Sequence, residues 1–308
     1  MAVSKIKQRL KLVVKIIIPR FMLYRLLKAF LRWKSVKVKK VFERAEESPV
    51  WLGQNELEAL QAKYSFPPEY GYDPQSLEQR GKERAKEIIG LIGRRITKIN
   101  TFLELGCWDG MTSYHLQRMG KSTTAIDKTS EGFDGRAARE GVKFMQMNSA
   151  DLQFKEESFD FVFSYNAFEH FTEPESVLKE VIRAVKKDGY IYLNFGPLYM
   201  APMGLHAYRS ITVPYCQFLF SKKTLEEYVS AKGLKQINFA KINGWSLEDY
   251  RKLWTRYDLQ LKKIKYNEIF DATHLDLIMK YPSCFRSKTQ YFDNLMVSTI
   301  EVLFKKIG

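Results

Sequence analysis

Short apolar runs alternate with amphipathic stretches from residue 76 to residue 195, and no other feature of the chain constrains its fold as strongly. Strands that alternate with helices are joined by right-handed crossovers, which place the strands in a parallel sheet with helices on both faces. The spacing predicts strands at 101–105, 122–126, 142–147, 159–164 and 190–195, and helices at 76–95, 111–119 and 174–187. The predicted fold class is therefore α/β, with a doubly wound sheet at its centre.

The alternation stops after the fifth predicted strand. An aromatic, Pro-containing stretch at 196–220 comes next, and because loops of this length are uncommon unless they are functional, we expect a lid-like insertion. Beyond it the pattern predicts a helix at 222–232, a strand at 234–242, a helix opened by a capping box at Ser246, and a final strand at 297–304. The predicted boundaries are 1–44 for a basic arm, 45–75 for an irregular connector and 76–308 for the α/β domain, with insertions at 196–225 and 244–295.

Basic residues are concentrated in the arm. The whole chain has a formal charge of +15, from 50 Lys and Arg against 35 Asp and Glu. Residues 1–42 hold 13 of the basic residues and no acid, which leaves 37 basic residues against 35 acids, a net charge of +2, in the remaining chain. A nearly neutral body disfavours a broad groove that tracks nucleic-acid phosphates.

The arm mixes apolar and basic residues throughout. Its longest uncharged stretches are about four residues, far short of the roughly 20 that span a bilayer. After Pro19, apolar residues recur at near-helical spacing between cations, which favours a helix lying in the interface of an anionic membrane. The alternatives are a helix packed on the protein's own core and a mitochondrial presequence.

The three cysteines, Cys107, Cys216 and Cys284, are widely separated, and they form no CxxC pair or metal-ligand cluster with histidine. This pattern indicates neither a disulfide framework nor a metal site, and it favours a reducing environment. The expected location is the cytoplasm, with contact to the membrane surface through residues 1–42. The sequence does not predict the oligomeric state.

The sharpest chemical signal is the segment Glu104-Leu-Gly106-Cys107-Trp108-Asp-Gly110, which follows a predicted strand and opens a predicted helix. Glycine lets a backbone turn tightly and approach a ligand that a Cβ atom would push away. Many strand-to-helix turns contain glycine without binding anything, so this segment needs support from other loops.

That support comes from polar residues after the next predicted strands. Asp127 ends the second strand, where a carboxylate can accept hydrogen bonds from both hydroxyls of a ribose. Asn148, Ser149 and Asp151 follow the third strand, where short polar side chains can read an adenine edge. Tyr165 lies at the end of the fourth. Open α/β sheets bind ligands at the carboxyl ends of their strands, so these loops are expected to form one site.

With these motifs, residues 80–195 and the terminal strand resemble the class I S-adenosylmethionine-dependent methyltransferases, whose pattern is E-x-G-x-G-x-G. Trp108 stands where that family has its middle glycine. The resemblance implies a Rossmann-like sheet of seven strands with an antiparallel last strand, S-adenosylmethionine as the cofactor, and insertions on the substrate side. The cofactor-binding residues that it implies are Glu104, Gly106, Cys107, Trp108, Gly110, Asp127, Asn148, Ser149, Asp151 and Tyr165.

A nicotinamide-dependent dehydrogenase is the competing enzyme class. It expects G-x-G-x-x-G, which seats a pyrophosphate on a helix N-terminus, whereas Gly106 and Gly110 have a different spacing. Glu104 would also be unfavourable beside a pyrophosphate. The cationic sulfonium and amino groups of S-adenosylmethionine suit carboxylates, so the methyltransferase interpretation is preferred.

Two of the four histidines are candidate catalytic bases. His170 follows Glu169 at the place where such methyltransferases often carry "EH", and His206 lies in the insertion after the fifth strand. A neutral imidazole can take the proton of a hydroxyl acceptor as the methyl group is transferred. His115, inside the first helix after the glycine loop, is expected to be structural.

No N/D-P-P-Y/F loop, typical of enzymes that methylate nucleobase amines, follows the fourth strand. This disfavours amine methylation of nucleic acids. The aromatic residues of the insertion at 196–220, which could stack on a sugar ring or form a second core, together with the basic arm favour O-methylation of a glycan, a lipid-linked intermediate or another small molecule. The alternatives are an RNA methyltransferase that uses the basic arm, and a non-catalytic binding protein that keeps the fold.

Overall fold

The computed structural model describes residues 33–67 and 71–308, which divide into two compact units. The smaller unit contains residues 33–51 and Ala272–Phe292. The larger unit contains Leu52–Asp271 and Asp293–Gly308, and it holds the whole sheet and every predicted site residue.

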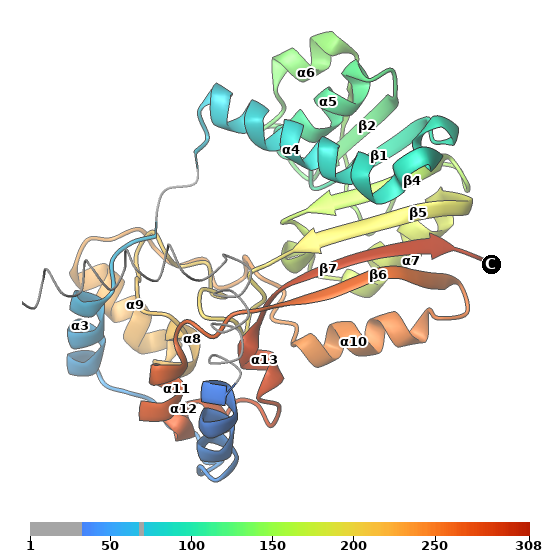
Figure 1. Cartoon of the computed structure of the whole chain (residues 1–308). Coiled ribbons are helices and arrows are strands. Elements are labelled where there is room, and N and C mark those ends of the chain that lie inside the picture. Colours follow the sequence, from blue (N-terminus) through green and yellow to red (C-terminus); the bar gives the residue numbers. More distant parts are fainter. Residues whose placement is uncertain (1–32, 68–70) are drawn as a thin grey trace, which may run out of the picture. The chain divides into compact units, whose positions relative to one another are not determined.

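The larger unit is built on a seven-stranded sheet in the order β3-β2-β1-β4-β5-β7-β6 (Figure 1). Its strands are β1 (Thr101–Leu105), β2 (Ser122–Asp127), β3 (Lys143–Gln146), β4 (Phe159–Tyr165), β5 (Val185–Phe195), β6 (Leu261–Phe270) and β7 (Val297–Lys306). The first five run parallel, whereas β7 is antiparallel to both of its neighbours, β5 and β6. The predicted doubly wound sheet with an antiparallel last strand is confirmed.

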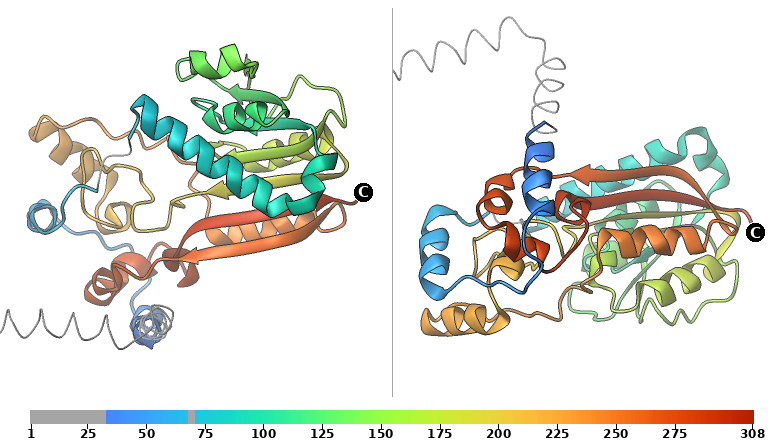
Figure 2. Two further views of the ribbon diagram at one scale, coloured as in Figure 1. Left: turned by 45° about the horizontal axis from the view of Figure 1, so that its top comes forward. Right: turned by 90° about the horizontal axis from the view of Figure 1, so that it is seen from below.

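Helices cover both faces of this sheet (Figure 2). On one face lie α4 (Pro74–Ile92) with the short η1 (Gly93–Lys98), α5 (Met111–Arg118) and α6 (Gly135–Glu140). On the other lie α7 (Pro174–Ala184) and α10 (Leu247–Arg256). The inward stripe of α7 includes Leu178 and Val181, which are almost fully buried against the sheet. Burying one such side chain contributes about 1.5–3 kcal/mol, which explains why an amphipathic pattern selects this packing.

The remaining elements of the larger unit are α3 (Gln54–Lys63), η2 (Phe168–His170), α8 (Cys216–Leu219), α9 (Lys222–Ala231) and α13 (Asp293–Met296). Two sequence-based expectations are wrong here. Residues 45–75 were expected to be irregular but include α3, and residues 234–242 form a loop rather than a strand. The sixth strand is β6, in a region whose pattern gave no clear assignment.

The smaller unit contains a helix at 33–43, α11 (Leu275–Lys280) and α12 (Pro282–Arg286). Its helix 33–43 buries Val38 and Phe42, and the Phe42 ring lies 5.6 Å from that of Phe292. Residues 33–43 therefore pack on the protein's own core, which was one of the alternatives for the arm. The lysines at 37, 39 and 40 of the same helix are exposed. Residues 1–32, which carry most of the predicted arm, lie outside the described residues.

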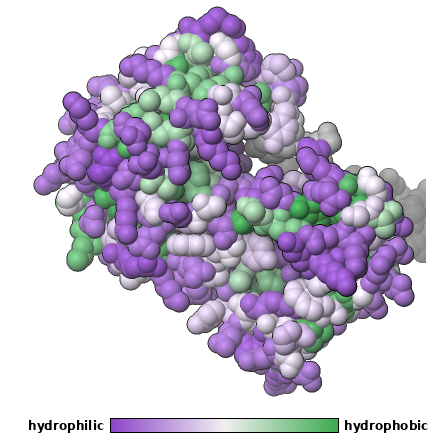
Figure 3. All heavy atoms as spheres, turned by 180° about the vertical axis from the view of Figure 1, so that it is seen from behind, coloured by the Kyte–Doolittle hydropathy of each residue, from purple (hydrophilic) through white to green (hydrophobic). Residues whose placement is uncertain are grey.

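Within residues 33–67 and 71–308, no helix is both long enough and apolar enough to cross a bilayer. Hydrophilic residues cover most of the face shown in Figure 3, and apolar atoms are scattered in small groups there. The large apolar side chains of the sheet are instead turned toward the two helical layers.

Candidate cofactor and acceptor site

The glycine loop connects the end of β1 to the start of α5 and requires an unusual backbone. Gly106 and Gly110 have φ angles of 62° and 69°, in the left-handed region that favours glycine. A Cβ atom on Gly106 would lie 2.5 Å from the Cβ of Ala167, and one on Gly110 would lie 2.5 Å from the Phe144 ring. Both conformation and packing thus exclude other residues, and the contact with Ala167 places the loop after β4 directly against the glycine loop.

Trp108 also has a positive φ, 48°, although it carries a large side chain. Left-handed backbone costs a non-glycine residue roughly 1–2 kcal/mol. Two contacts hold it there: its N–H donates to Oδ2 of Asp127 at 3.0 Å, and its indole lies beside Gly132, where a Cβ would come within 2.6 Å. The indole remains 44% exposed. The departure from the family pattern is therefore accommodated without losing the shape of the loop.

Asp127, at the end of β2, is suited to bind a diol. Its Oδ2 accepts from Trp108, and its Oδ1 accepts from the N–H of Thr129 at 3.3 Å. A carboxylate oxygen has two lone pairs, so each still has one for a ribose hydroxyl. The side chain is only half-buried, and a ligand can reach it.

Glu104 and Cys107 lie behind the loop rather than on its surface. The buried carboxylate of Glu104 accepts from Ser113, at 3.1 Å from the N–H and 2.7 Å from the hydroxyl, and so anchors the first turn of α5. Burial raises the pKa of Glu104 to about 7, against the opposing effect of these hydrogen bonds. Burial also raises the pKa of the Cys107 thiol. The backbone N–H of Cys107 donates to the Ile126 carbonyl at 3.0 Å.

The polar turn after β3 lies next to Asp127. The N–H of Met147 donates to the Asp127 carbonyl at 2.8 Å, which joins the two loops. Asn148 closes the turn with its side-chain oxygen 3.0 Å from the N–H of Ala150. Ser149 is buried, whereas Asn148 and the next acid, Asp151, are exposed at the sheet edge. This arrangement is compatible with the predicted contact to an adenine.

Tyr165 is placed differently from the other predicted residues. Its ring is buried under α4, with its hydroxyl 2.9 Å from Oε2 of Glu87 and the Arg84 guanidinium 4.7 Å from its ring centre. The structure therefore brings Tyr165 to α4, while the loops that follow β1, β2 and β3 come together above the sheet edge.

Arg84 is a candidate site residue that the sequence analysis missed. Burial raises the pKa of Glu104, Asp109 and Glu169, and the charge of Arg84 partly counters that rise in all three. It is thus a cation close to the acids of the loops after β1 and β4. A signal was present in the sequence, because Arg80 and Arg84 are four residues apart and share a face of the helix that leads into β1.

The loops after β4 and β5 bring Glu169, His170 and His206 together. Glu169 is 1% exposed; its Oε1 accepts from the N–H of Gly196 at 3.2 Å and lies 3.9 Å from Nε2 of His170. The ring centres of His170 and His206 are 5.1 Å apart, and that of Tyr208 is 5.7 Å from His206. Both predicted catalytic histidines are therefore in one cluster, although they are far apart in the sequence.

Backbone carbonyls define the protonation of both rings. Nδ1 of His170 is 2.7 Å from the Lys241 carbonyl, and Nε2 of His206 is 3.1 Å from the Pro197 carbonyl. A carbonyl can only accept, so each of these nitrogens carries the hydrogen and the other nitrogen of each neutral ring has a lone pair. Burial lowers the pKa of His170, and burial followed by the neighbouring His170 lowers the pKa of His206 to about 3.

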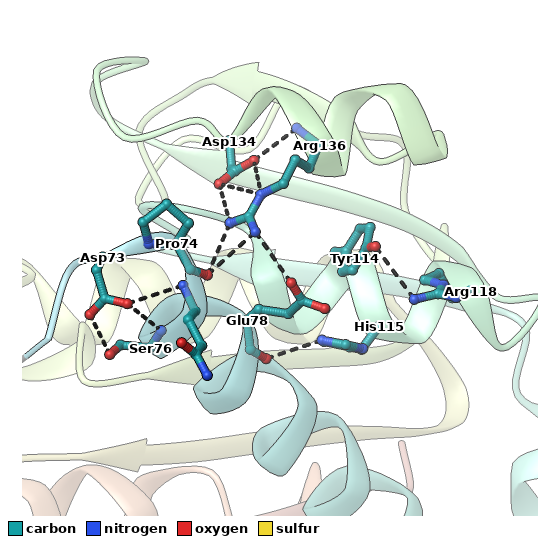
Figure 4. A network of polar contacts seen from close by, with 10 residues as sticks. Asp73, Pro74, Ser76, Glu78, Tyr114, His115, Arg118, Asp134 and Arg136 are labelled. Atoms are coloured by element: carbon teal, nitrogen blue, oxygen red, sulfur yellow. Dashed lines mark hydrogen bonds and ion pairs between the residues drawn. The ribbon is translucent and has the colours of Figure 1, made fainter.

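His115 faces away from this cluster. Its Nε2 is 3.1 Å from the carbonyl of Glu78, so the ring links α5 to α4, beside the Arg136 ion pairs with Asp134 and Glu78 (Figure 4). The predicted structural role fits this position.

The residues present fit S-adenosylmethionine. The loop is acidic where the sulfonium and ammonium groups would lie, Asp127 can receive a ribose, and Arg84 offers a cation for a carboxylate. One buried oxygen, Oε2 of Glu169, has no hydrogen-bond partner among the residues that the structure describes. A buried polar atom without a partner is costly, and a bound ligand would remove that cost.

Comparison with known proteins agrees with this geometry. Residues 103–193 match the family described as "Methyltransferase domain". The chain is 28% identical over 115 residues to the ubiquinone biosynthesis O-methyltransferase of Haemophilus ducreyi, covering 34% of this chain and 46% of that protein. It is 28% identical over 97 residues to the uncharacterized methyltransferase YcgJ of Bacillus subtilis, covering 30% of this chain and 38% of that protein.

The chain thus spans less than half the length of these two curated relatives. The crystal structure of YcgJ from Bacillus subtilis superposes with a TM-score of 0.44 and 16% identity, covering 73% of this chain and 97% of that chain. The family match includes the glycine loop, Asp127 and the segment that carries Glu169 and His170. Residues 103–193 are thus similar to the methyltransferase domains of enzymes whose cofactor is S-adenosylmethionine.

Proposed function

We propose that the protein transfers a methyl group from S-adenosylmethionine to a hydroxyl of a small-molecule acceptor, such as a glycan or a lipid-linked intermediate. The observation that carries this proposal is the pair of neutral imidazoles, His170 and His206, each fixed by one nitrogen to a backbone carbonyl. Both are in loops that leave the carboxyl ends of parallel strands, where such sheets bind their ligands.

The cofactor supplies an electrophilic methyl group on a sulfonium. The residues of this chain hold it in place: Asp127 binds the ribose, and Arg84 binds the carboxylate of the methionine moiety. The glycine loop lets the backbone approach. Orientation of this kind supplies most of the rate enhancement that a bimolecular transfer needs.

A hydroxyl acceptor must also lose its proton, because a neutral hydroxyl is a weak nucleophile. A lone pair on His170 or His206 can accept that proton, and the low pKa of each ring keeps the lone pair available at neutral pH. The carbonyls of Lys241 and Pro197 keep each ring in the required tautomer. An amine acceptor can lose its proton to solvent and would need no such arrangement. The name of the Haemophilus ducreyi relative, an O-methyltransferase, supports the choice of a hydroxyl.

The basic arm is proposed to bring the protein to an anionic membrane, where a lipid-linked acceptor would be found. Within the described part of the arm, Lys37, Lys39 and Lys40 are exposed on the helix at 33–43, and Trp33 is 65% exposed. Cations and an aromatic residue on one helix suit the headgroup region.

The test is methyl transfer from labelled S-adenosylmethionine to hydroxyl-bearing phenols, glycans and polyprenyl-linked sugars, with total RNA as a parallel acceptor. Formation of S-adenosylhomocysteine with a hydroxyl acceptor supports the proposal. Transfer to RNA alone would favour the RNA methyltransferase alternative. Failure to bind the cofactor at all would favour a non-catalytic protein that keeps the fold.

A further inference from the structure

Glu169 is a deeply buried ionisable group of the larger unit that the proposed mechanism does not use. The side chain is 1% exposed, and its Oε2 is buried without a hydrogen-bond partner in the part of the chain that the structure describes. Its other oxygen accepts one hydrogen bond, from the N–H of Gly196 immediately after β5. A buried carboxylate that is half satisfied either carries a proton or awaits a cation.

The position of Glu169 indicates which cation it would meet. It lies two residues beyond Ala167, which contacts the position of a Cβ on Gly106, and its Oε1 is 3.9 Å from Nε2 of His170. Glu169 is thus on the loop that packs against the glycine loop, and its carboxylate lies next to the candidate base. A sulfonium held by the glycine loop would add a positive charge to these surroundings.

We propose that Glu169 is a proton acceptor coupled to the charge of the cofactor: it is neutral in the free protein, ionises when the sulfonium binds, and takes up a proton once the methyl group has left. This inference rests on the proposed function. Transfer to a hydroxyl breaks one C–S bond, whose electron pair stays on sulfur, forms one C–O bond and frees one proton. His170 receives that proton and passes it to Glu169, so that a cation and a carboxylate become a neutral thioether and a neutral acid.

The electrostatic surroundings agree with this cycle. Burial raises the pKa of Glu169 to about 8, so the free protein holds it in the neutral form at pH 7. A neighbouring cation favours the carboxylate and lowers the pKa again. The ionisable groups that face Glu169 are Arg84 from α4, Lys241 from the loop before α10, Tyr250 from α10 and the adjacent His170.

The experiment compares proton exchange on binding of two ligands to the full chain. Titration calorimetry at pH 7, in buffers of different ionisation enthalpy, gives the protons released with S-adenosylmethionine and with S-adenosylhomocysteine. The two ligands share the amino, carboxylate, ribose and adenine groups, so the proton exchange that these shared groups cause cancels in the difference. We expect S-adenosylmethionine to release roughly one proton more.

Glu169→Gln should bind both ligands and abolish that difference. Glu301→Gln is the control, because Glu301 is also a buried glutamate of the sheet but lies on β7, paired with Lys265 and outside the glycine loop; it should keep the difference. If the unaltered protein releases equally many protons with both ligands, the inference is wrong while the proposed function stands. This outcome does not depend on any variant being folded. If Glu169→Gln binds both ligands and keeps the difference, another group is responsible and the inference is also wrong. If neither ligand binds the unaltered protein, the inference and the proposed function fail together.

Discussion

The rings of His170 and His206 meet edge to face, with their planes at 81°, although one lies after β4 and the other in the insertion after β5. Each ring donates one hydrogen bond to a carbonyl outside the pair, so their orientations are set independently. Two imidazolium ions at this separation would repel each other, and burial also disfavours a charge on either ring. Both effects keep the pair neutral.

His206→Ala should lower turnover on the true acceptor at least about tenfold while changing S-adenosylmethionine affinity by no more than about twofold. The reason is that the ring is proposed to act on the acceptor proton and not on the cofactor. His206→Asn is the matched control, since asparagine tolerates the positive φ of 53° and removes the imidazole without emptying the position. Full activity of the asparagine variant would show that the residue positions the loop and is not a base.

The variant His170→Ala distinguishes two roles that His170 could have. If His170 accepts the proton, His170→Ala should reduce turnover about as much as His206→Ala and leave cofactor binding nearly unchanged. If it only supports the loop through the Lys241 carbonyl, the variant should bind the cofactor more weakly instead. Steady-state kinetics with calorimetry on the same preparation distinguishes these outcomes.

Asp127→Ala should weaken binding of S-adenosylhomocysteine by about 1.5–3 kcal/mol, as expected when hydrogen bonds to a charged group are removed. Part of that cost is indirect, because Asp127 also fixes the backbone of Trp108. Asp127→Asn keeps an acceptor for the Trp108 N–H and removes the charge, so it should cost less. Unchanged affinity in the alanine variant, or tighter binding of NAD than of S-adenosylhomocysteine, would refute the ribose assignment.

Removing residues 1–32 should leave a folded protein that binds the cofactor but no longer sediments with anionic vesicles. A deletion that extends to residue 42 should be less stable, because it also removes Val38 and Phe42 and exposes the Phe292 ring. Neutral vesicles and RNA must be run alongside, since both lipid and phosphate binding weaken with salt. Undiminished binding to anionic vesicles after the shorter deletion would place the membrane contact elsewhere.

Asp160→Asn should destabilise the larger unit by about 2 kcal/mol at pH 7. Burial disfavours the charged carboxylate, but hydrogen bonds from Lys186, Thr101 and Asn100 outweigh it and lower the pKa of Asp160 to about 2. The folded pKa is below the unfolded value near 4, so this stability is present above pH 4 and is lost as the pH falls toward 2. Urea unfolding at pH 7, 4 and 3 should show the variant and the parent converging; a difference independent of pH would contradict the assignment.

Most of the sheet was predictable because each parallel strand is a short apolar run that stands out in the local sequence. Strand β6 was not predictable in this way. The residues predicted as a strand, 234–242, are rich in apolar residues, but Asn238 closes an Asx turn on Ala240 and no described strand pairs with them. Residues 261–270 carry lysines at 262, 263 and 265, and gain their regular structure from pairing with β7, about 30 residues later in the chain. Pairing across such a separation leaves little trace in a local pattern.

The site was predictable where it depends on loops that directly follow strands. For that reason Asp127 meets the glycine loop at Trp108, Gly106 meets the loop after β4 at Ala167, and the two histidines meet each other. Arg84 could not be found in the same way, because it enters from a helix that precedes the sheet, and only packing defines which of its faces turns inward. The side of β4 on which Tyr165 lies also depends on strand alternation, which sends its ring to α4.

The two outer strands of the sheet differ in how they resist pairing with another chain. An outer strand presents unpaired N–H and carbonyl groups, which can template aggregation. At one end, β3 has only 4 residues and offers a short edge. At the other, β6 has 10 residues but carries the exposed pair Lys262 and Lys263 directly after its first residue, and their charges would repel those of a like strand docked beside them. Brevity at one edge and charge at the other therefore protect the sheet from growing into an intermolecular one.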